Sequence, residues 1–159
     1  MKAFIIKPTK DFMGALLGGT FFDNFLLEEA TIKTFNTFQI NGRIIPEFYD
    51  DYEFGYEFSF WKDIRPTAFS LIKGKNLPVS CHFVLHLNPD EMNSLIEANN
   101  IAEYKEQISG FVLNIKFQNS EIQIITSIAF NTFVMNKAID EVWDKYAEEL
   151  LKVFSPEQQ

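Results

Sequence analysis

The residues best suited to bind a ligand are four basic side chains and a tryptophan that lie close together in the sequence. The stretch WKDIRPTAFSLIKGKN, at 61–76, contains Trp61, Lys62, Arg65, Lys73 and Lys75. We expect a strand at 67–73, which would bring these side chains to one sheet edge as a small basic and aromatic surface. Such a surface suits a carboxylate, a phosphate or an acidic peptide. The alternative is that the lysines occupy turns and that Arg65 pairs with the acidic face of a predicted strand at 51–60.

Nucleophilic or metal-ion catalysis is not indicated by the histidines and the one cysteine. Cys81 adjoins His82, but neighbouring strand residues point to opposite faces, and Cys81 shares its face with apolar side chains. We therefore expect Cys81 to be a buried, inert thiol. His82 and His86 would lie on one face about 13 Å apart, too far to bind the same metal ion. We expect both at partly exposed strand positions.

Two acidic pairs, Asp50–Asp51 and Asp90–Glu91, are of a type used in acid–base or Mg²⁺ chemistry. Asp90–Glu91 follows Asn88–Pro89, and acidic residues stabilise a helix N-terminus, so we expect helix capping there. Asp50–Asp51 is expected in a turn. The sequence has no GxSxG motif, and Gly18–Gly19 follows a predicted helix, whereas a phosphate-binding loop precedes one. We expect no catalytic residue, no metal site and no cofactor.

Composition favours an ordinary globular domain. At 159 residues, with 47% apolar and 23% charged residues, the chain suits a single domain spanning 1–159. The net charge of −8 argues against general attraction to nucleic acid or to an anionic membrane. The start MKAFIIKPTK has too short an apolar run for a signal peptide, and no run approaches the roughly 20 residues that span a bilayer. We expect a cytoplasmic protein with no membrane partner.

Two parts of the sequence recur. FNTFQINGRI begins at Phe35 and FNTFVMNKAI begins at Phe130, while AFIIKPTKDFMGALL aligns without a gap with HFVLHLNPDEMNSLI. Each copy of the second pair indicates a short strand followed by an amphipathic helix. Because the two agreements occur in the same order, we expect a duplicated half-domain with a pseudo-twofold axis. The predicted half-repeats are approximately 1–76 and 77–135.

The predicted fold class is α+β, with two β-α-β-β(-β) units in antiparallel sheets. Hairpin turns are expected at Asn41–Gly42, around Gly74–Asn76 and at Asn119–Ser120. Residues 51–60 alternate between aromatic side chains and acidic or small ones, which predicts a strand with one acidic face. The last element is predicted to be a helix at approximately 137–154.

The stretches KAFIIKPTKDFMGALL, FLLEEATIKTFNTFQINGRI and FVLNIKFQNSEIQIITSIAF resemble the domain of DNA sliding clamps. This resemblance covers most of the chain and implies helices on one side of antiparallel sheets that join across subunits into a ring. EATIKTFNTFQINGR and IRPTAFSLIKGK more closely resemble a family of unknown function from low-GC Gram-positive bacteria, which implies no activity. Clamp helices face DNA with basic residues, whereas the predicted helix at 89–98 is acidic, so DNA is disfavoured as a partner.

These observations favour a non-catalytic protein-interaction module of clamp-like fold, and a non-enzymatic role. Its partner would be an unidentified protein or a second copy, paired through exposed sheet edges. Two alternatives from other classes stay open. One is a small metal-dependent hydrolase or nuclease that uses dispersed carboxylates, and the other is a nucleic-acid-binding protein that uses the basic and aromatic patch at 61–75.

Overall fold

The computed structural model of the chain describes residues 1–50 and 54–158. Over these residues the chain forms a seven-stranded sheet in the order β3-β2-β4-β5-β6-β1-β7, in which each neighbouring pair is antiparallel. This arrangement confirms the expected α+β class with an antiparallel sheet. The strands are β1 (Ala3–Ile6), β2 (Leu26–Lys33), β3 (Thr37–Asn41), β4 (Ser80–His86), β5 (Ile108–Gln118), β6 (Glu121–Phe130) and β7 (Glu157–Gln158).

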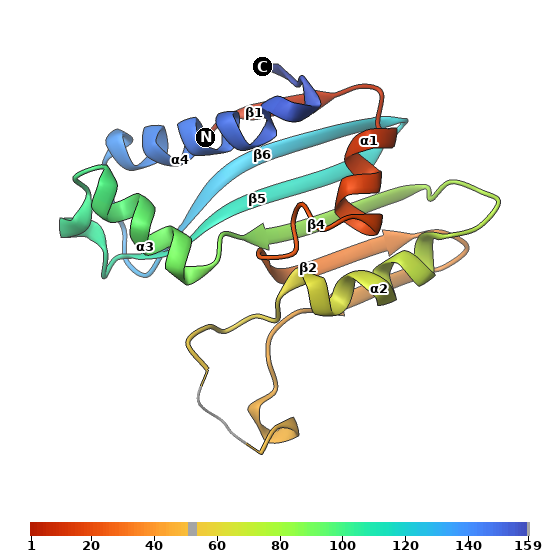
Figure 1. Cartoon of the computed structure of the whole chain (residues 1–159), viewed down its shortest axis with the longest axis horizontal. Helices are drawn as coiled ribbons and strands as arrows, with labels where there is room; N and C mark the ends of the chain where they lie inside the picture. The colour runs from red at the N-terminus through yellow and green to blue at the C-terminus, as the bar shows by residue number, and fades with distance from the viewer. Residues whose placement is uncertain (51–53, 159) are drawn as a thin grey trace.

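The helices cover one side of this sheet (Figure 1). Their buried side chains belong to the same apolar core as the inward-facing side chains of the strands. None of the helices in the described part of the chain is both long and apolar enough to cross a membrane. The α-helices are α1 (Lys10–Met13), which continues as a π-helical turn at Gly14–Gly18, α2 (Trp61–Ile72), α3 (Pro89–Ala98) and α4 (Lys137–Leu151).

Local sequence signals explain most of these elements. In β5 every second residue from Phe111 to Phe117 is buried in the core, which is the period-two pattern of a sheet with one covered face. The predicted hairpin at Asn119–Ser120 is confirmed, and both residues have positive φ, as a type I′ turn requires. The predicted cap of α3 is also confirmed, because the Asn88 side chain accepts a hydrogen bond from the Glu91 N–H. The predicted last helix is formed by α4 and a 3-10 turn at Lys152–Phe154.

The expected strand at 67–73 and its hairpin around Gly74–Asn76 are wrong, because residues 61–72 form helix α2. Apolar residues at 61, 64, 68, 71 and 72 follow the helical period and face the core. Pro66 lies inside this helix, although proline lacks the N–H that a helix interior uses. Burial of Trp61 and Ala68 therefore outweighs the local cost of the proline.

Two further expectations in this region are wrong. The chain reverses between β2 and β3 at 34–36, not at Asn41–Gly42, where β3 ends. Residues 54–60 are not a strand and make only isolated bridges, from Phe58 to Arg43 and from Phe60 to Leu26. The rest of the predicted strand, including Asp51 and Glu53, lies outside the described residues.

The pseudo-twofold repeat is not confirmed. The order strand, helix, strand, strand, helix does occur twice, as β1-α1-β2-β3-α2 and β4-α3-β5-β6-α4. However, β4 pairs with β2 and β5, whereas its counterpart β1 pairs with β6 and β7. The two FNTF stretches also differ, since the first forms the β2–β3 turn and the start of β3 while the second begins at the last residue of β6.

Candidate functional site

Two of the five predicted site residues, Trp61 and Arg65, are engaged within the fold. Trp61 is fully buried at the start of α2, and its indole N–H donates a 2.7 Å hydrogen bond to the carbonyl oxygen of Leu16. Arg65 forms a two-pronged ion pair with Asp23, with Nε to Oδ1 at 2.9 Å and Nη2 to Oδ2 at 3.2 Å. Arg65 thus pairs with Asp23, while Asp51 and Glu53 of the expected acidic face lie outside the described residues.

The three lysines are split between the two ends of α2. Lys62 lies at the N-terminal end, where its ammonium group is 5.2 Å from the centre of the Phe60 ring. Lys73 and Lys75 follow the C-terminal end, so about 16 Å of helix separates Lys62 from Lys73. The structure thus brings Lys73 and Lys75 together and does not gather the five residues on one surface.

Lys73 and Lys75 border a groove of about 400 Å³ between the β2–β3 turn and the connection from α2 to β4. We call it the Lys73 groove. A backbone hydrogen bond from Val79 to the carbonyl of Lys33 holds its two sides together. Its lining residues are Thr34, Phe35, Leu71, Ile72, Lys73, Gly74, Lys75, Asn76, Leu77 and Val79.

Exposed apolar side chains and positive charge coincide in the Lys73 groove. Phe35, Leu77 and Val79 are 85%, 79% and 66% exposed, respectively, although all three are large and apolar. No acidic residue is among the lining residues of the described chain, and within 1–50 and 54–158 neither lysine forms an ion pair. The Thr34 hydroxyl oxygen is buried and has no hydrogen-bond partner among the described residues. The groove therefore offers apolar contact and two cations.

A second candidate site lies at the opposite end of β2, about 20 Å from Thr34. Its centre is Glu28, whose Oε1 is 2.8 Å from the Nε2 of His86 on the neighbouring strand β4. An ionised carboxylate only accepts hydrogen bonds, so Nε2 carries the proton in this pair. His86 is 6% exposed, which corrects the expectation of a partly exposed position.

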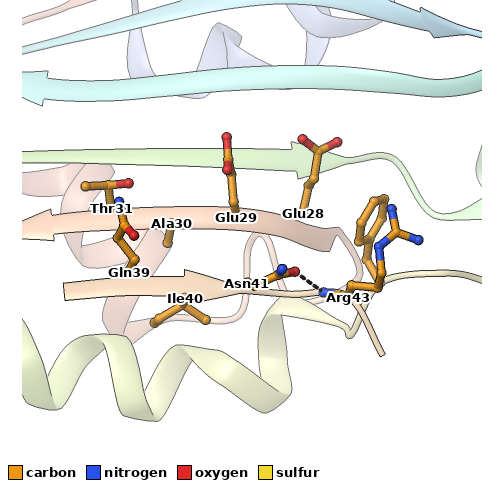
Figure 2. Close-up of a pocket in the computed structure, with 9 residues that line it drawn as sticks. Glu28, Glu29, Ala30, Thr31, Gln39, Ile40, Asn41 and Arg43 are labelled. Carbon is orange, nitrogen blue, oxygen red and sulfur yellow. Dashed lines mark hydrogen bonds between the residues drawn. The ribbon is translucent and has the colours of Figure 1, made fainter. Parts of the chain in front are cut away.

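A bulge in β2 gives this site two carboxylates. The register between β2 and β4 shifts between Leu27 and Glu29, so Glu28 is the extra residue. Figure 2 shows the side chains of Glu28 and Glu29 pointing the same way, although consecutive strand residues normally point to opposite faces. The bulge therefore doubles the negative charge on one side of the strand.

Arg43 and Phe58 form a wall of the Glu28 site. The Arg43 guanidinium lies 5.1 Å from the centre of the Phe58 ring and 3.3 Å from Glu57, and Phe58 packs on the His86 ring at 5.0 Å between centres. The Arg43 N–H donates to the side chain of Asn41 (Figure 2). Hollows of about 470 and 370 Å³ lie beside this wall, and both include Glu28, Arg43 and Phe58 in their lining.

In the Glu28 site, His86 holds the carboxylate of Glu28 in place. The His86 ring is not arranged to transfer protons to or from a substrate. One ring nitrogen of His86 is occupied by Glu28, and Gly110 lies against the other, Nδ1. A general base needs its free nitrogen to face the substrate. Glu28, whose side chain is 40% exposed, keeps its other oxygen available to a ligand.

Two further residues weighed for catalysis, Cys81 and Glu91, have roles in the fold. Cys81 is buried as predicted, and burial raises the pKa of its thiol to about 12, so it is not a reactive thiolate. Glu91 of the pair Asp90–Glu91 accepts a hydrogen bond from the Tyr146 hydroxyl as well as lying in the first turn of α3. Among residues 1–50 and 54–158, no three His, Cys, Asp or Glu side chains lie where they could hold a metal ion together.

Sequence reasoning missed Glu28, Arg43, Phe58 and His86 as one site. His86 and Glu28 are 58 positions apart, and their contact depends on the pairing of β2 with β4. No spacing in the sequence signals that pairing. Lys73 and Lys75 were predicted as site residues because they are close in sequence. Phe35, which is exposed across the groove from them, was not predicted as a site residue.

Comparison with known proteins gives a family and no activity. No curated protein matches the chain, and no solved structure matches it. Residues 15–155 match DUF5721, a family of unknown function, so both candidate sites lie within the matched region. The expected membership in a family of unknown function is confirmed, and the chain belongs to the DUF5721 family.

Proposed function

We propose that the protein is a non-catalytic interaction module, folded as a single domain, that binds an acidic and aromatic polypeptide segment in the Lys73 groove. The observation that supports this proposal is that Lys73 and Lys75 lie beside three exposed apolar side chains in one groove. Neither lysine forms an ion pair within the described chain. Apolar anchors in a pocket supply most of the binding energy of an interface, and complementary charge supplies specificity.

An acidic peptide fits this groove better than a nucleic acid does. The chain has a net charge of −8, which repels a long polyanion, while two lysines attract a short acidic segment at close range. Trp61, the aromatic ring of the predicted patch at 61–75, is buried and has no face open to a base. Phe35 is the one aromatic ring among the described lining residues of the groove, whereas Leu77 and Val79 favour apolar partners and offer no flat face for stacking.

The proposal is tested by fluorescence anisotropy with a labelled eight-residue peptide in which Glu and Asp flank one Phe and one Tyr. We expect saturable binding that weakens about tenfold in the double variant Lys73→Glu/Lys75→Glu, because charge reversal places like charges at the interface. The matched control is Lys116→Glu/Lys137→Glu, which changes the net charge equally and lies outside the groove. Absence of peptide binding, equal binding by both double variants, or preferential binding of single-stranded DNA would contradict the proposal.

A second candidate function is the binding of a small organic cation at the Glu28 site. The observation in its favour is that Arg43 already places a guanidinium between the Phe58 ring and the Glu57 carboxylate. Three glutamates line the two hollows beside that single guanidinium, so carboxylates outnumber cationic side chains there. Carboxylates beside an aromatic face are a common arrangement for binding ammonium and guanidinium groups.

This second function is tested by NMR titration with n-butylguanidinium, and with butanoate as the anion of similar size. We expect the cation to shift backbone signals of β2 and of residues 56–58, with about tenfold weaker binding in Glu28→Gln. Asp140→Asn, in the first turn of α4 and outside the lining of both hollows, is the control. Equal shifts from butanoate, or unchanged affinity in Glu28→Gln, would exclude cation binding at this site.

A further inference from the structure

We infer that the natural occupant of the Lys73 groove is residues 45–50 of a second copy of this chain, so that the protein self-associates head to tail. This inference rests on the proposed function, because it requires the groove to bind an acidic and aromatic segment. It adds the identity of that segment and the geometry of the assembly.

Residues 45–50, which we call the acidic–aromatic segment, have the negative charges and apolar side chains that complement the groove. Glu47 and Asp50 are exposed and supply two negative charges to match Lys73 and Lys75. Phe48 and Ile45 are 83% and 66% exposed and supply two apolar anchors. Neither carboxylate forms an ion pair with a described residue.

The segment is ordered in a shape that presents its aromatic rings. Pro46–Phe48 form a 3-10 turn, closed by hydrogen bonds from Phe48 to the carbonyl of Ile45 and from Tyr49 to that of Pro46. The rings of Phe48 and Tyr49 pack edge to face at 5.4 Å. A segment that is already ordered loses less conformational entropy on binding, so docking is favoured.

The segment and the groove of one copy lie at opposite ends of α2. Residues 57–60 lead from the neighbourhood of the segment into the N-terminal end of α2, whereas the groove begins at its C-terminal end (Figure 1). A twelve-residue helix is about 18 Å long. The segment therefore reaches the groove of another copy and not its own.

Contact between two different surfaces determines which kinds of assembly can form. Each copy uses its groove toward one neighbour and its segment toward another, which is a heterologous interface. Such interfaces close into a ring when the rotation between copies permits and otherwise extend as an open filament. When both contacts are made with the same neighbour, the smallest closed form is a reciprocal dimer, so association yields this dimer, a larger ring or a filament as concentration rises.

The experiment is light scattering coupled to size exclusion, over a concentration series of the parent chain, three variants and the Lys116→Glu/Lys137→Glu control. Lys73→Glu/Lys75→Glu reverses the groove, Glu47→Lys/Asp50→Lys reverses the segment, and the quadruple variant combines both. We expect mass to rise with concentration for the parent chain and to stay at one copy for each double variant. The quadruple variant should regain association, because its charges are again complementary.

The outcomes separate this inference from the proposed function. A parent chain that stays monomeric to millimolar concentration, or a quadruple variant that behaves like the double variants while remaining folded by circular dichroism, overturns the inference. If the parent binds the acidic aromatic peptide but stays monomeric, the groove function holds and only self-docking is wrong. If the Lys116→Glu/Lys137→Glu control also becomes monomeric, association depends on net charge, and the assignment to the groove is wrong.

Discussion

The imidazole of His86 lies directly against the α-carbon of Gly110, so that a methyl group added to this glycine would overlap with Nδ1. Gly110 belongs to β5 and His86 to β4, and the two strands are paired. On its other side the ring is covered by Phe58 and bonded to Glu28. The missing side chain of Gly110 therefore makes the space in which His86 holds the carboxylate of Glu28.

Gly110→Ala should displace the His86 ring and weaken its hydrogen bond to Glu28. We expect the free energy of unfolding to fall by about 1–3 kcal/mol, as for other overpacked cores. Urea denaturation followed by circular dichroism measures the loss. Gly14→Ala is the matched control, because a methyl group there meets no atom within 4 Å and the backbone is helical. Equal stability of the two variants would show that the ring is not confined.

Trp61→Phe tests whether this tryptophan is part of the core. The change leaves the carbonyl of Leu16 without its hydrogen bond, and a buried unpaired carbonyl costs about 1–3 kcal/mol. Chemical denaturation should show that loss, while Phe69→Leu, at a partly exposed position of α2, should change stability by less than about 0.5 kcal/mol. Acrylamide should quench the parent fluorescence weakly, because Trp61 and Trp143 are both fully buried. Strong quenching would place a tryptophan at the surface.

The ion pair between Arg65 and Asp23 should contribute measurably to stability. Both side chains are about four-fifths buried, and the guanidinium contacts both carboxylate oxygens. A double-mutant cycle with Arg65→Lys and Asp23→Asn is expected to give a coupling energy of about 1–3 kcal/mol. The exposed pair Lys7–Glu121 provides the comparison and should give less than about 1 kcal/mol. Similar coupling in the two pairs would show that the geometry of Arg65 adds nothing.

The parts of the fold that the sequence predicted correctly are those set by local signals. Asn88 and Pro89 start α3, Asn119–Ser120 turns the β5–β6 hairpin, and the apolar stripe of α4 has the helical period. Each of these signals acts within a few residues, so one sequence is enough to find it. The helix α2 was missed because Pro66 and the lysines resemble a corner and a turn, although its apolar residues follow the helical period.

The sheet order could not be predicted because it depends on contacts between distant residues. Repeated sequence suggested two equivalent halves, but β1 pairs with β6 and β7 while β4 pairs with β2 and β5. The same distant pairing brings Glu28 to His86 and thereby forms the Glu28 site. Lys73 and Lys75 were found from their spacing, but the role of Phe35 across the groove required the position of the β2–β3 turn.

Cys81 should make the protein less stable as pH rises above 9. Burial raises the pKa of this thiol from its ordinary value of 9.0 to about 12. Between pH 9 and 12 the unfolded chain loses the thiol proton while the folded chain keeps it, so ionisation stabilises the unfolded state. Below pH 9 both states are protonated, and this effect is absent.

The measurement is the free energy of unfolding of the parent chain and of Cys81→Ala between pH 8 and 11. At pH 8 the alanine variant has the lower free energy of unfolding, because the smaller side chain leaves a cavity. Its deficit should shrink by about 1.4 kcal/mol for each pH unit above 9, because only the parent chain has a thiol to ionise. Tyr146, whose pKa is raised to about 12 by burial and by its hydrogen bond to Glu91, affects both proteins equally and cancels in the difference. Parallel stability curves over this range would show that the Cys81 thiol ionises as readily in the folded chain as in the unfolded one.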